Sequence, residues 1–90
     1  MSAAEATVEV KNKLGLHLRA ASTLAQAMGK FKSSITLARG KEQVNAKSVT
    51  ALIMLGAGRG TRLKAKADGD DAREALATLQ RLFEERFGED

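Results

Sequence analysis

Between Arg62 and Ala67 the sequence alternates strictly between cationic and apolar residues. Leu63, Ala65 and Ala67 are interleaved with three basic residues, of which Arg62 is the first. Because successive side chains of a strand point to opposite faces, this segment predicts a strand with one apolar and one solvent-exposed face. A sheet with one exposed face is typical of antiparallel architecture, so the opposite face must be covered by other elements of the chain.

Three further segments show the same two-residue alternation. They are residues 6–11, with Val8 and Val10 on one side, residues 33–38, with Ile35 and Leu37 on one side, and the short segment 43–46. The last two are separated by a tight turn over residues 39–42, which predicts a β-hairpin. We therefore expect four strands.

Two longer segments have apolar residues at helical spacing. The first starts at Leu18 and ends at Gly29, and its apolar stripe consists of Ala21, Leu24, Ala25 and Met28. The second opens at Asp70 or Asp71, and its stripe consists of Ala75, Leu76, Leu79, Leu82 and Phe83. Acidic residues in its first turn and Arg86 near its end have the charge order that the helix dipole favours.

Ser48 is suited to cap a short apolar helix over residues 49–55, because its hydroxyl can accept a backbone N–H of the first turn. The expected element order is therefore β-α-β-β-α-β-α. This order predicts an α+β two-layer open-faced sandwich, in which three helices cover one face of a four-stranded antiparallel sheet. At 90 residues, the chain is expected to form a single domain over residues 1–90.

Composition excludes several kinds of site. Without Cys there are no disulfides, Cys-based zinc sites or thiol catalysis, and a single His excludes a multi-histidine metal site. We therefore expect no metal and no cofactor. No apolar run approaches the roughly 18 residues of a membrane helix, and residues 1–10 lack the pattern of a signal peptide, which predicts a cytoplasmic protein without membrane binding.

Charge divides the chain into a basic and an acidic part. Residues 1–67 contain twelve Lys and Arg against three Asp and Glu, whereas residues 68–90 contain three against eight. A basic body favours anionic partners, such as phosphates, nucleic acid or acidic protein surfaces. The only aromatic residues are three Phe, which leaves few platforms on which the bases of single-stranded nucleic acid can stack.

His17, the only histidine, lies at the predicted junction between a strand and a helix. A helix N-terminus presents unpaired N–H groups and the positive end of the helix dipole, so it favours an anion. Arg19 can bind two phosphate oxygens through its guanidinium. Since a neutral imidazole can attack phosphorus, the pair predicts a phosphoryl acceptor at His17. The alternative is an exposed loop histidine with no chemical role.

Two short motifs surround the candidate residues. The first is Gly15-Leu16-His17-Leu18-Arg19-Ala20-Ala21, and the second is Ala46-Lys47-Ser48-Val49. They resemble, respectively, the active-site motif G-L-H-x-R-P-A and the signature that opens the short helix in the HPr family, the histidine phosphocarriers of the bacterial phosphotransferase system. The resemblance extends from about residue 7 to residue 87 without a large gap. It implies a phosphocarrier that is not itself an enzyme, with His17 phosphorylated on its pros nitrogen (Nδ1) beside Arg19.

The resemblance also implies partners. Enzyme I, charged from phosphoenolpyruvate, would donate the phosphoryl group, and IIA domains would accept it. Residues 12–15, Asn-Lys-Leu-Gly, are at least as similar to the nitrogen-regulatory branch of the family as to its sugar-uptake branch. A nitrogen-branch (NPr-type) regulatory phosphocarrier therefore remains an alternative. A carrier that fits several partners in turn is expected to be a monomer.

Further roles follow from the same resemblance. Ser48 matches the serine that HPr kinase/phosphorylase modifies in some members, which implies a regulatory phosphorylation site. Residues that flank the active site in the family dock with partner proteins, and the matching residues are Leu18, Ser22, Lys47, Val49, Thr50 and Ile53. The alternative for Val49 and Ile53 is a place in the core.

One residue departs from the family motif, because Ala20 stands where the motif has Pro. Pro in the first helical turn restricts φ without removing a needed N–H, so its absence makes the helix start less rigid. Ala is the best helix former, and the helix is expected to persist. The substitution puts the rate of transfer or the choice of partner in doubt.

Two other classes of function remain open. A small RNA-binding domain would bind through Lys30, Lys32, Lys64 and Lys66, would lose affinity steeply with salt, and would not depend on His17. A purely regulatory module would be phosphorylated at Ser48 and would not use His17. The presence of both His17 and Arg19 argues against this second class.

Overall fold

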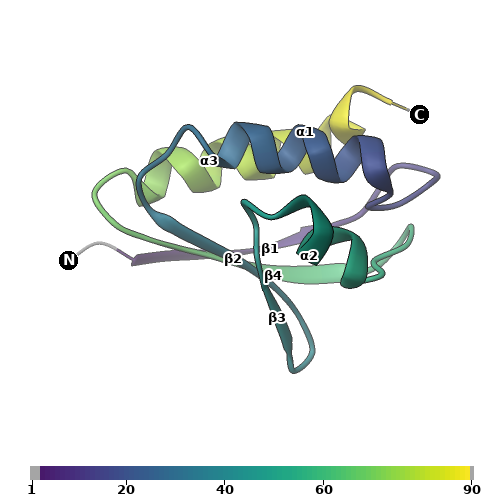
Figure 1. Ribbon diagram of the computed structural model, residues 1–90, viewed down its shortest axis with the longest axis horizontal. Coiled ribbons are helices and arrows are strands. Elements are labelled where there is room, and N and C mark those ends of the chain that lie inside the picture. Colours follow the sequence, from purple (N-terminus) through teal and green to yellow (C-terminus); the bar gives the residue numbers. More distant parts are fainter. Residues whose placement is uncertain (1–2, 90) are drawn as a thin grey trace.

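The computed structural model describes residues 3–89. Its strands are β1 (Ala3–Glu9), β2 (Ser34–Arg39), β3 (Glu42–Asn45) and β4 (Arg62–Asp68). They form one antiparallel sheet in the order β1-β4-β2-β3. The helices are α1 (Leu18–Met28), α2 (Val49–Met54) and α3 (Ala72–Glu84), followed by a short 3-10 turn, η1 (Arg86–Gly88). Figure 1 shows the three helices on one side of the sheet, which confirms the predicted two-layer α+β sandwich.

The alternating segment forms β4 and lies inside the sheet, between β1 and β2. Leu63, Ala65 and Ala67 are buried beneath the helices, whereas the basic residues between them are exposed on the open face. On that face Lys64 Nζ lies 3.8 Å from Glu5 Oε1 on β1. The sequence pattern therefore placed both faces of this strand correctly.

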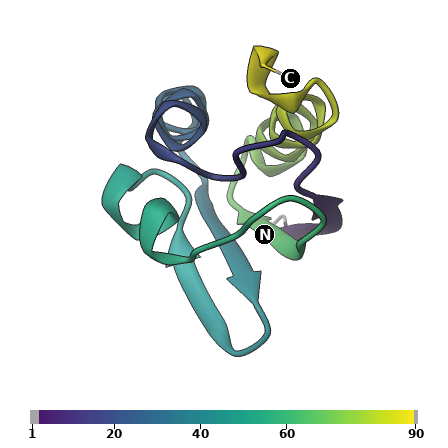
Figure 2. The same ribbon diagram turned by 90° about the vertical axis from the view of Figure 1, so that its right-hand side faces the viewer.

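The core lies between the sheet and the two long helices. Figure 2, a view roughly along α1 and α3, shows these helices side by side above the sheet. Leu24 and Met28 of α1 and Leu79 and Phe83 of α3 are fully buried between the two layers. Leu82, expected in the same stripe, is only half-buried at its edge.

Several details of the elements differ from those expected from the sequence. β1 begins at Ala3 rather than at residue 6, because its pairing with β4 extends as far as Ala3 opposite Asp68. Gly29 follows α1 as expected, but its φ of −62° is right-handed rather than the left-handed value typical of such a glycine. Arg86, predicted near the end of the last long helix, lies two residues beyond Glu84, the last residue of α3, and has a φ of 58°.

Asp71 precedes α3, as predicted, but its carboxylate does not cap that helix. It accepts hydrogen bonds from the backbone N–H groups of Lys32 and Ser33, each at 2.9 Å, and from the Ser33 hydroxyl. Asp71 therefore ties the start of α3 to the segment that leads into β2.

This cluster predicts an acid-dependent loss of stability. The hydrogen bonds, first that from the Ser33 hydroxyl, lower the pKa of Asp71 from 3.8 to about 2. A carboxyl whose pKa is lowered by folding stabilises the native state above its unfolded pKa and loses that contribution as the pH falls through the folded value. We expect the urea midpoint of the native chain to fall between pH 4 and pH 2, and to fall less in Asp71→Asn.

The exposed neighbour Asp70 supplies the matched control for this measurement. Asp70→Asn should keep the acid dependence of the native chain. An equal acid dependence in Asp71→Asn and the native chain would contradict the role given to the Asp71 cluster.

Candidate functional site

His17 is the N-cap residue of α1. Its backbone is extended, with φ −76° and ψ −178°, and its carbonyl oxygen accepts a hydrogen bond of 2.8 Å from the N–H of Ala21. The side chain makes no capping bond, so the imidazole is available for other contacts. Ala20, at the family's Pro position, is fully buried, and α1 begins at Leu18 as expected.

The loop before His17 is held against the loop that follows α2. The Leu16 N–H donates to the carbonyl oxygen of Ala57 at 2.9 Å, and the side-chain amide of Asn12 donates to the carbonyl oxygen of Gly15 at 2.7 Å. Gly15 has a φ of 71°, and a Cβ there would lie only 2.5 Å from the Ala57 carbonyl oxygen. The glycine next to the predicted active-site residues is therefore required by both the backbone conformation and the close approach of a second loop.

The imidazole of His17 lies beside a carboxylate from the other end of the described chain. Its Nε2 is 2.8 Å from Oε1 of Glu89, and the two side chains are 30% and 16% exposed, respectively. A hollow of about 230 Å³ is lined by Lys13, Leu14, His17, Arg19 and Glu89. The structure thus places the predicted phosphoryl acceptor, His17, and the predicted phosphate-binding residue, Arg19, in the lining of one hollow.

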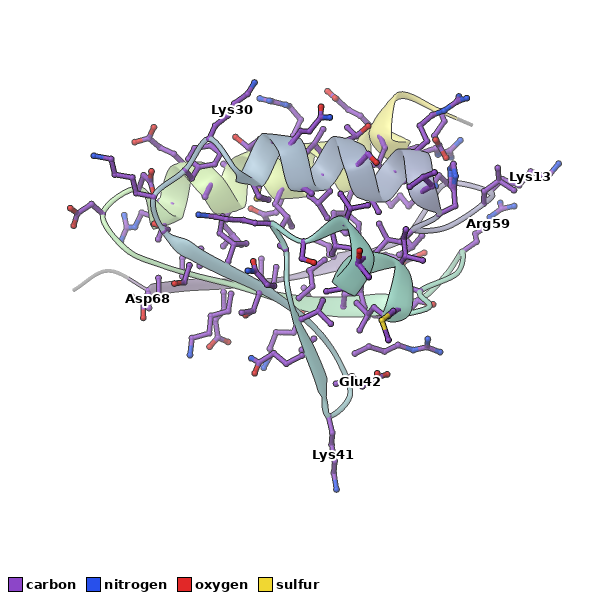
Figure 3. All side chains as sticks on the ribbon, in the orientation of Figure 1. Lys13, Lys30, Lys41, Glu42, Arg59 and Asp68 are labelled. Atoms are coloured by element: carbon purple, nitrogen blue, oxygen red, sulfur yellow. The ribbon has the colours of Figure 1, made fainter. Side chains whose placement is uncertain are left out.

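The surroundings of this hollow suit an anion. Arg19 is exposed, and within residues 3–89 its guanidinium has no hydrogen-bond or ion-pair partner. The first backbone N–H groups of α1 have no acceptor within the helix, and they carry the positive end of its dipole. Figure 3 shows Lys13 and Arg59 projecting at the same end of the molecule. A phosphoryl group on His17 would therefore meet cations and free donors.

The short helix α2 reaches this region with its C-terminal end. The Ser48 hydroxyl accepts the N–H of Ala51 at 3.2 Å, as predicted for an N-cap. Figure 1 shows α2 alongside α1, and its far end leads into the loop that contacts the His17 loop. Ile53 and Met54, at that end, are 40% and 75% exposed, whereas Val49 is half-buried against the core.

The expected docking residues are spread over α1 and α2. Leu18 and Thr50 are exposed and Ser22 is half-buried. Lys47 donates through Nζ to the carbonyl oxygen of Phe31 at 2.7 Å, beyond the end of α1 opposite to His17. Two exposed apolar residues were not singled out from the sequence: Leu14, within the segment 12–15, and Met54, within the predicted short helix 49–55.

Glu89 and Asn12 were also missed as site residues. Glu89 lies 72 positions from His17, and no spacing or motif links them. Asn12 is fully buried and donates from Nδ2 to Glu89 Oε1 at 2.9 Å. Asn12 lies just before the motif that contains His17, and nothing in this part of the sequence indicates its hydrogen bond to Glu89.

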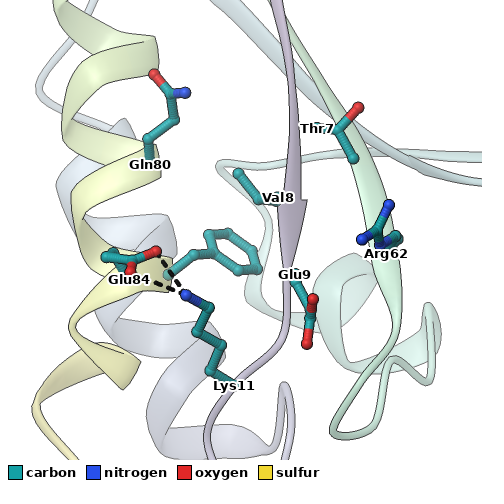
Figure 4. Close-up of a pocket in the computed structure, with 8 residues that line it drawn as sticks. Thr7, Val8, Glu9, Lys11, Arg62, Gln80 and Glu84 are labelled. Carbon is teal, nitrogen blue, oxygen red and sulfur yellow. Dashed lines mark hydrogen bonds and ion pairs between the residues drawn. The ribbon is translucent and has the colours of Figure 1, made fainter.

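A larger hollow lies elsewhere and contains none of the predicted site residues. It measures about 340 Å³, lies between β1, the start of β4 and the end of α3, and is bordered by a hydrogen-bonded ion pair of 2.8 Å between Lys11 and Glu84 (Figure 4). Residues 3–89 contain no group of three side chains able to hold a metal ion. Over the same residues, every helix is too short or too polar to cross a lipid bilayer.

Comparisons with known proteins agree on one family. The family model described as "PTS HPr component phosphorylation site" matches residues 4–85. A phosphocarrier protein HPr of Xylella fastidiosa is 45% identical over 86 residues, which cover 96% of this chain and 97% of the relative. A phosphocarrier protein NPr of Shewanella violacea is 38% identical, over 99% and 98% of the two chains. The crystal structure of HPr-C-His from Thermoanaerobacter tengcongensis superposes with a TM-score of 0.93 at 42% identity, over 97% and 98% of the two chains.

Proposed function

The chain belongs to the HPr family of phosphocarrier proteins, and we propose that it accepts a phosphoryl group from enzyme I on His17 and passes it to IIA domains. As a phosphocarrier it is a substrate of phosphotransfer enzymes rather than an enzyme. The observation that carries the proposal is the imidazole at the start of α1, in one hollow with the exposed side chain of Arg19. Such a carrier would act as one cytoplasmic domain, residues 1–90, and as a monomer.

The site can hold a transferred phosphoryl group in two ways. Arg19 can donate two hydrogen bonds to phosphoryl oxygens, and the first N–H groups of α1 can donate further ones. Beside His17 the described residues offer no pair of carboxylates, metal cluster or nucleotide loop that would complete a catalytic site. The partner proteins would therefore supply the remaining catalytic groups for each transfer.

The function is tested by incubating the chain with phosphoenolpyruvate and an enzyme I from the same organism, followed by intact-mass spectrometry. We expect one phosphoryl adduct that is lost in acid and kept in alkali, as phosphohistidine is. Transfer of that adduct to an added IIA domain would complete the test. The absence of an adduct would contradict the proposal.

Arg19 provides a graded prediction for the same assay. We expect Arg19→Ala to lower the rate of phosphoryl transfer about 100-fold, the usual effect of removing one donor to a developing negative charge. Arg19→Lys should be intermediate, because an ammonium keeps the charge but not the forked geometry. Arg73→Ala, which removes an exposed arginine in the first turn of α3, outside the hollow, is the matched control and should transfer at the native rate.

The surface around His17 supports transient docking with these partners. Leu14, Leu18, Ile53 and Met54 are the large apolar side chains that residues 3–89 leave exposed. They belong to the loop before α1, the first turn of α1 and the end of α2. Apolar side chains beside cations such as Lys13 and Arg19 suit partners with apolar and acidic surfaces. Ser22, Lys47, Val49 and Thr50 would contribute at the edge of this contact.

Ser48 is proposed as a regulatory site for an HPr kinase/phosphorylase. Its half-buried hydroxyl already caps α2, so a phosphate there would add about −1.5 to −2 charges at the start of this helix, which carries several of the proposed docking residues. That charge would weaken binding to acidic partners. In the mass assay with ATP and such a kinase, the expected adduct is stable in acid and absent in Ser48→Ala.

The nitrogen-regulatory branch is a second candidate, favoured by the NPr relative that matches over nearly the whole chain. Parallel transfer assays to sugar-specific and nitrogen-branch IIA domains separate the two, because the faster acceptor identifies the branch. An RNA-binding role is less supported: Lys64 lies near Glu5 on the open face of the sheet, whereas Lys30 projects from the opposite layer (Figure 3).

A further inference from the structure

Glu89 reaches His17 through an unusual piece of backbone. After α3 the chain turns back through Arg86 and Phe87, whose φ values of 58° and 55° are rare for residues other than glycine. Phe87 is buried, and its ring contacts that of Phe83 edge-on, with centroids 4.9 Å apart. Strained conformations persist only where the surroundings hold them, and they cluster at functional sites. Here the turn delivers the Glu89 carboxylate to the imidazole.

A buried amide fixes that carboxylate from the other side. Asn12 is completely buried, and its Nδ2 donates both to Glu89 Oε1 and to the carbonyl oxygen of Gly15, while its Oδ1 has no partner within residues 3–89. Because both partners are acceptors, the amide must present its nitrogen to them. Asn12 therefore couples the position of Glu89 to the loop that carries His17.

The contact defines which ring nitrogen carries the proton. The hydrogen bond from His17, followed by the one from Asn12, holds the pKa of the Glu89 carboxyl below its usual range, so this group is an anion near neutral pH. A carboxylate only accepts hydrogen bonds, so Nε2 must be the protonated nitrogen. The lone pair of the neutral ring then resides on Nδ1, the nitrogen expected to attack phosphorus.

We propose that Glu89, held by Asn12, is a positioning residue for phosphoryl transfer at His17: it keeps the proton on Nε2 and pairs with the positive charge that the ring carries while Nδ1 is bonded to phosphorus. This inference rests on the proposed phosphocarrier function. A carboxylate that orients and stabilises a reacting histidine in this way acts without gaining the proton itself.

Phosphoryl transfer onto His17 and transfer from it each conserve bonds and electron pairs, and neither requires a proton to move at the His17 ring. In the first, the Nδ1 lone pair forms a bond to phosphorus while the N–P bond of a donor phosphohistidine breaks, and the donor ring takes that electron pair. The His17 ring then holds both Nδ1–P and Nε2–H, and its charge faces Glu89. In the second, an acceptor nitrogen bonds to phosphorus, the Nδ1–P bond breaks, and its electron pair returns to Nδ1.

The single histidine makes a direct test possible, because ¹⁵N-histidine labelling reports only the two ring nitrogens of His17. Glu89→Gln keeps an acceptor but removes the charge, so we expect the Nε2–H form to persist and the transfer rate to fall about tenfold. Glu89→Ala removes both the acceptor and the charge, so the Nδ1–H form should appear in the spectrum and the transfer rate should fall further. Glu85→Gln, an exposed acid nearby, is the matched control.

Native transfer rates in both Glu89 variants, with a native ratio of ring tautomers, would overturn the proposal. Thermal melting of each variant checks that the fold is kept. Absence of phosphorylation in the native chain would instead contradict the proposed function. The tautomer comparison in the unphosphorylated proteins would still decide whether Glu89 positions the ring.

Discussion

His17→Ala is expected to take up no phosphoryl group under conditions in which the native chain takes up one. His17 is the only imidazole in the sequence, so no other residue of the chain can form a phosphohistidine. The substitution should leave the fold intact, because the side chain is partly exposed and does not cap α1. Loss of the adduct would then report chemistry rather than unfolding.

The control for this variant is Ser48→Ala, which keeps the imidazole and should be phosphorylated like the native chain. An acid-labile adduct on His17→Ala would contradict the assignment of the acceptor. Thermal unfolding of both variants, followed by circular dichroism, verifies that each retains the native structure during the assay.

Gly15→Ala should be the most damaging of the small substitutions near the site. The left-handed φ of 71° costs a non-glycine residue about 1–2 kcal/mol. A Cβ only 2.5 Å from the Ala57 carbonyl oxygen also forces the two loops apart, which costs about 1–3 kcal/mol more. We expect the free energy of unfolding to fall by about 2–5 kcal/mol, a large share of the roughly 5–13 kcal/mol of a chain this size.

Gly40→Ala separates the cost of the left-handed backbone from the cost of the clash between loops. Gly40 has a similar φ of 59°, but a Cβ there would meet nothing within 4 Å. It should therefore show only the conformational cost of about 1–2 kcal/mol. Equal losses for the two variants in urea denaturation would mean that the approach of the Ala57 loop does not constrain Gly15.

The parts of the fold that could be predicted are those encoded by neighbouring residues. The alternation over residues 62–67 gives the two faces of β4 because both depend only on the two-residue period of a strand. The spacing of Ala21, Leu24, Ala25 and Met28 gives the buried side of α1 in the same way. Ser48 was recognisable as a cap because its partner is three residues away.

Contacts between distant segments could not be predicted in this way. The sequence predicted that Asp70 or Asp71 opens a helix, yet the carboxylate of Asp71 binds Lys32 and Ser33, which lie just before β2 and 39 and 38 residues away in the sequence. Arg86 was expected near the end of α3 because its charge suited a helix end, but the turn of the chain at Phe87, which packs against Phe83, was not visible in the sequence. At the site, His17 and Arg19 come from one motif, but Glu89 is brought to the ring only by the complete fold.

The most direct test of the account is the nuclear magnetic resonance spectrum of the phosphorylated chain, labelled with ¹⁵N in its single histidine. A ³¹P–¹⁵N coupling identifies the ring nitrogen that carries the phosphoryl group. The account predicts this coupling at Nδ1 of His17, with Nε2 still protonated beside Glu89. Coupling at Nε2, or a phosphoryl group with no coupling to histidine nitrogen, would contradict it.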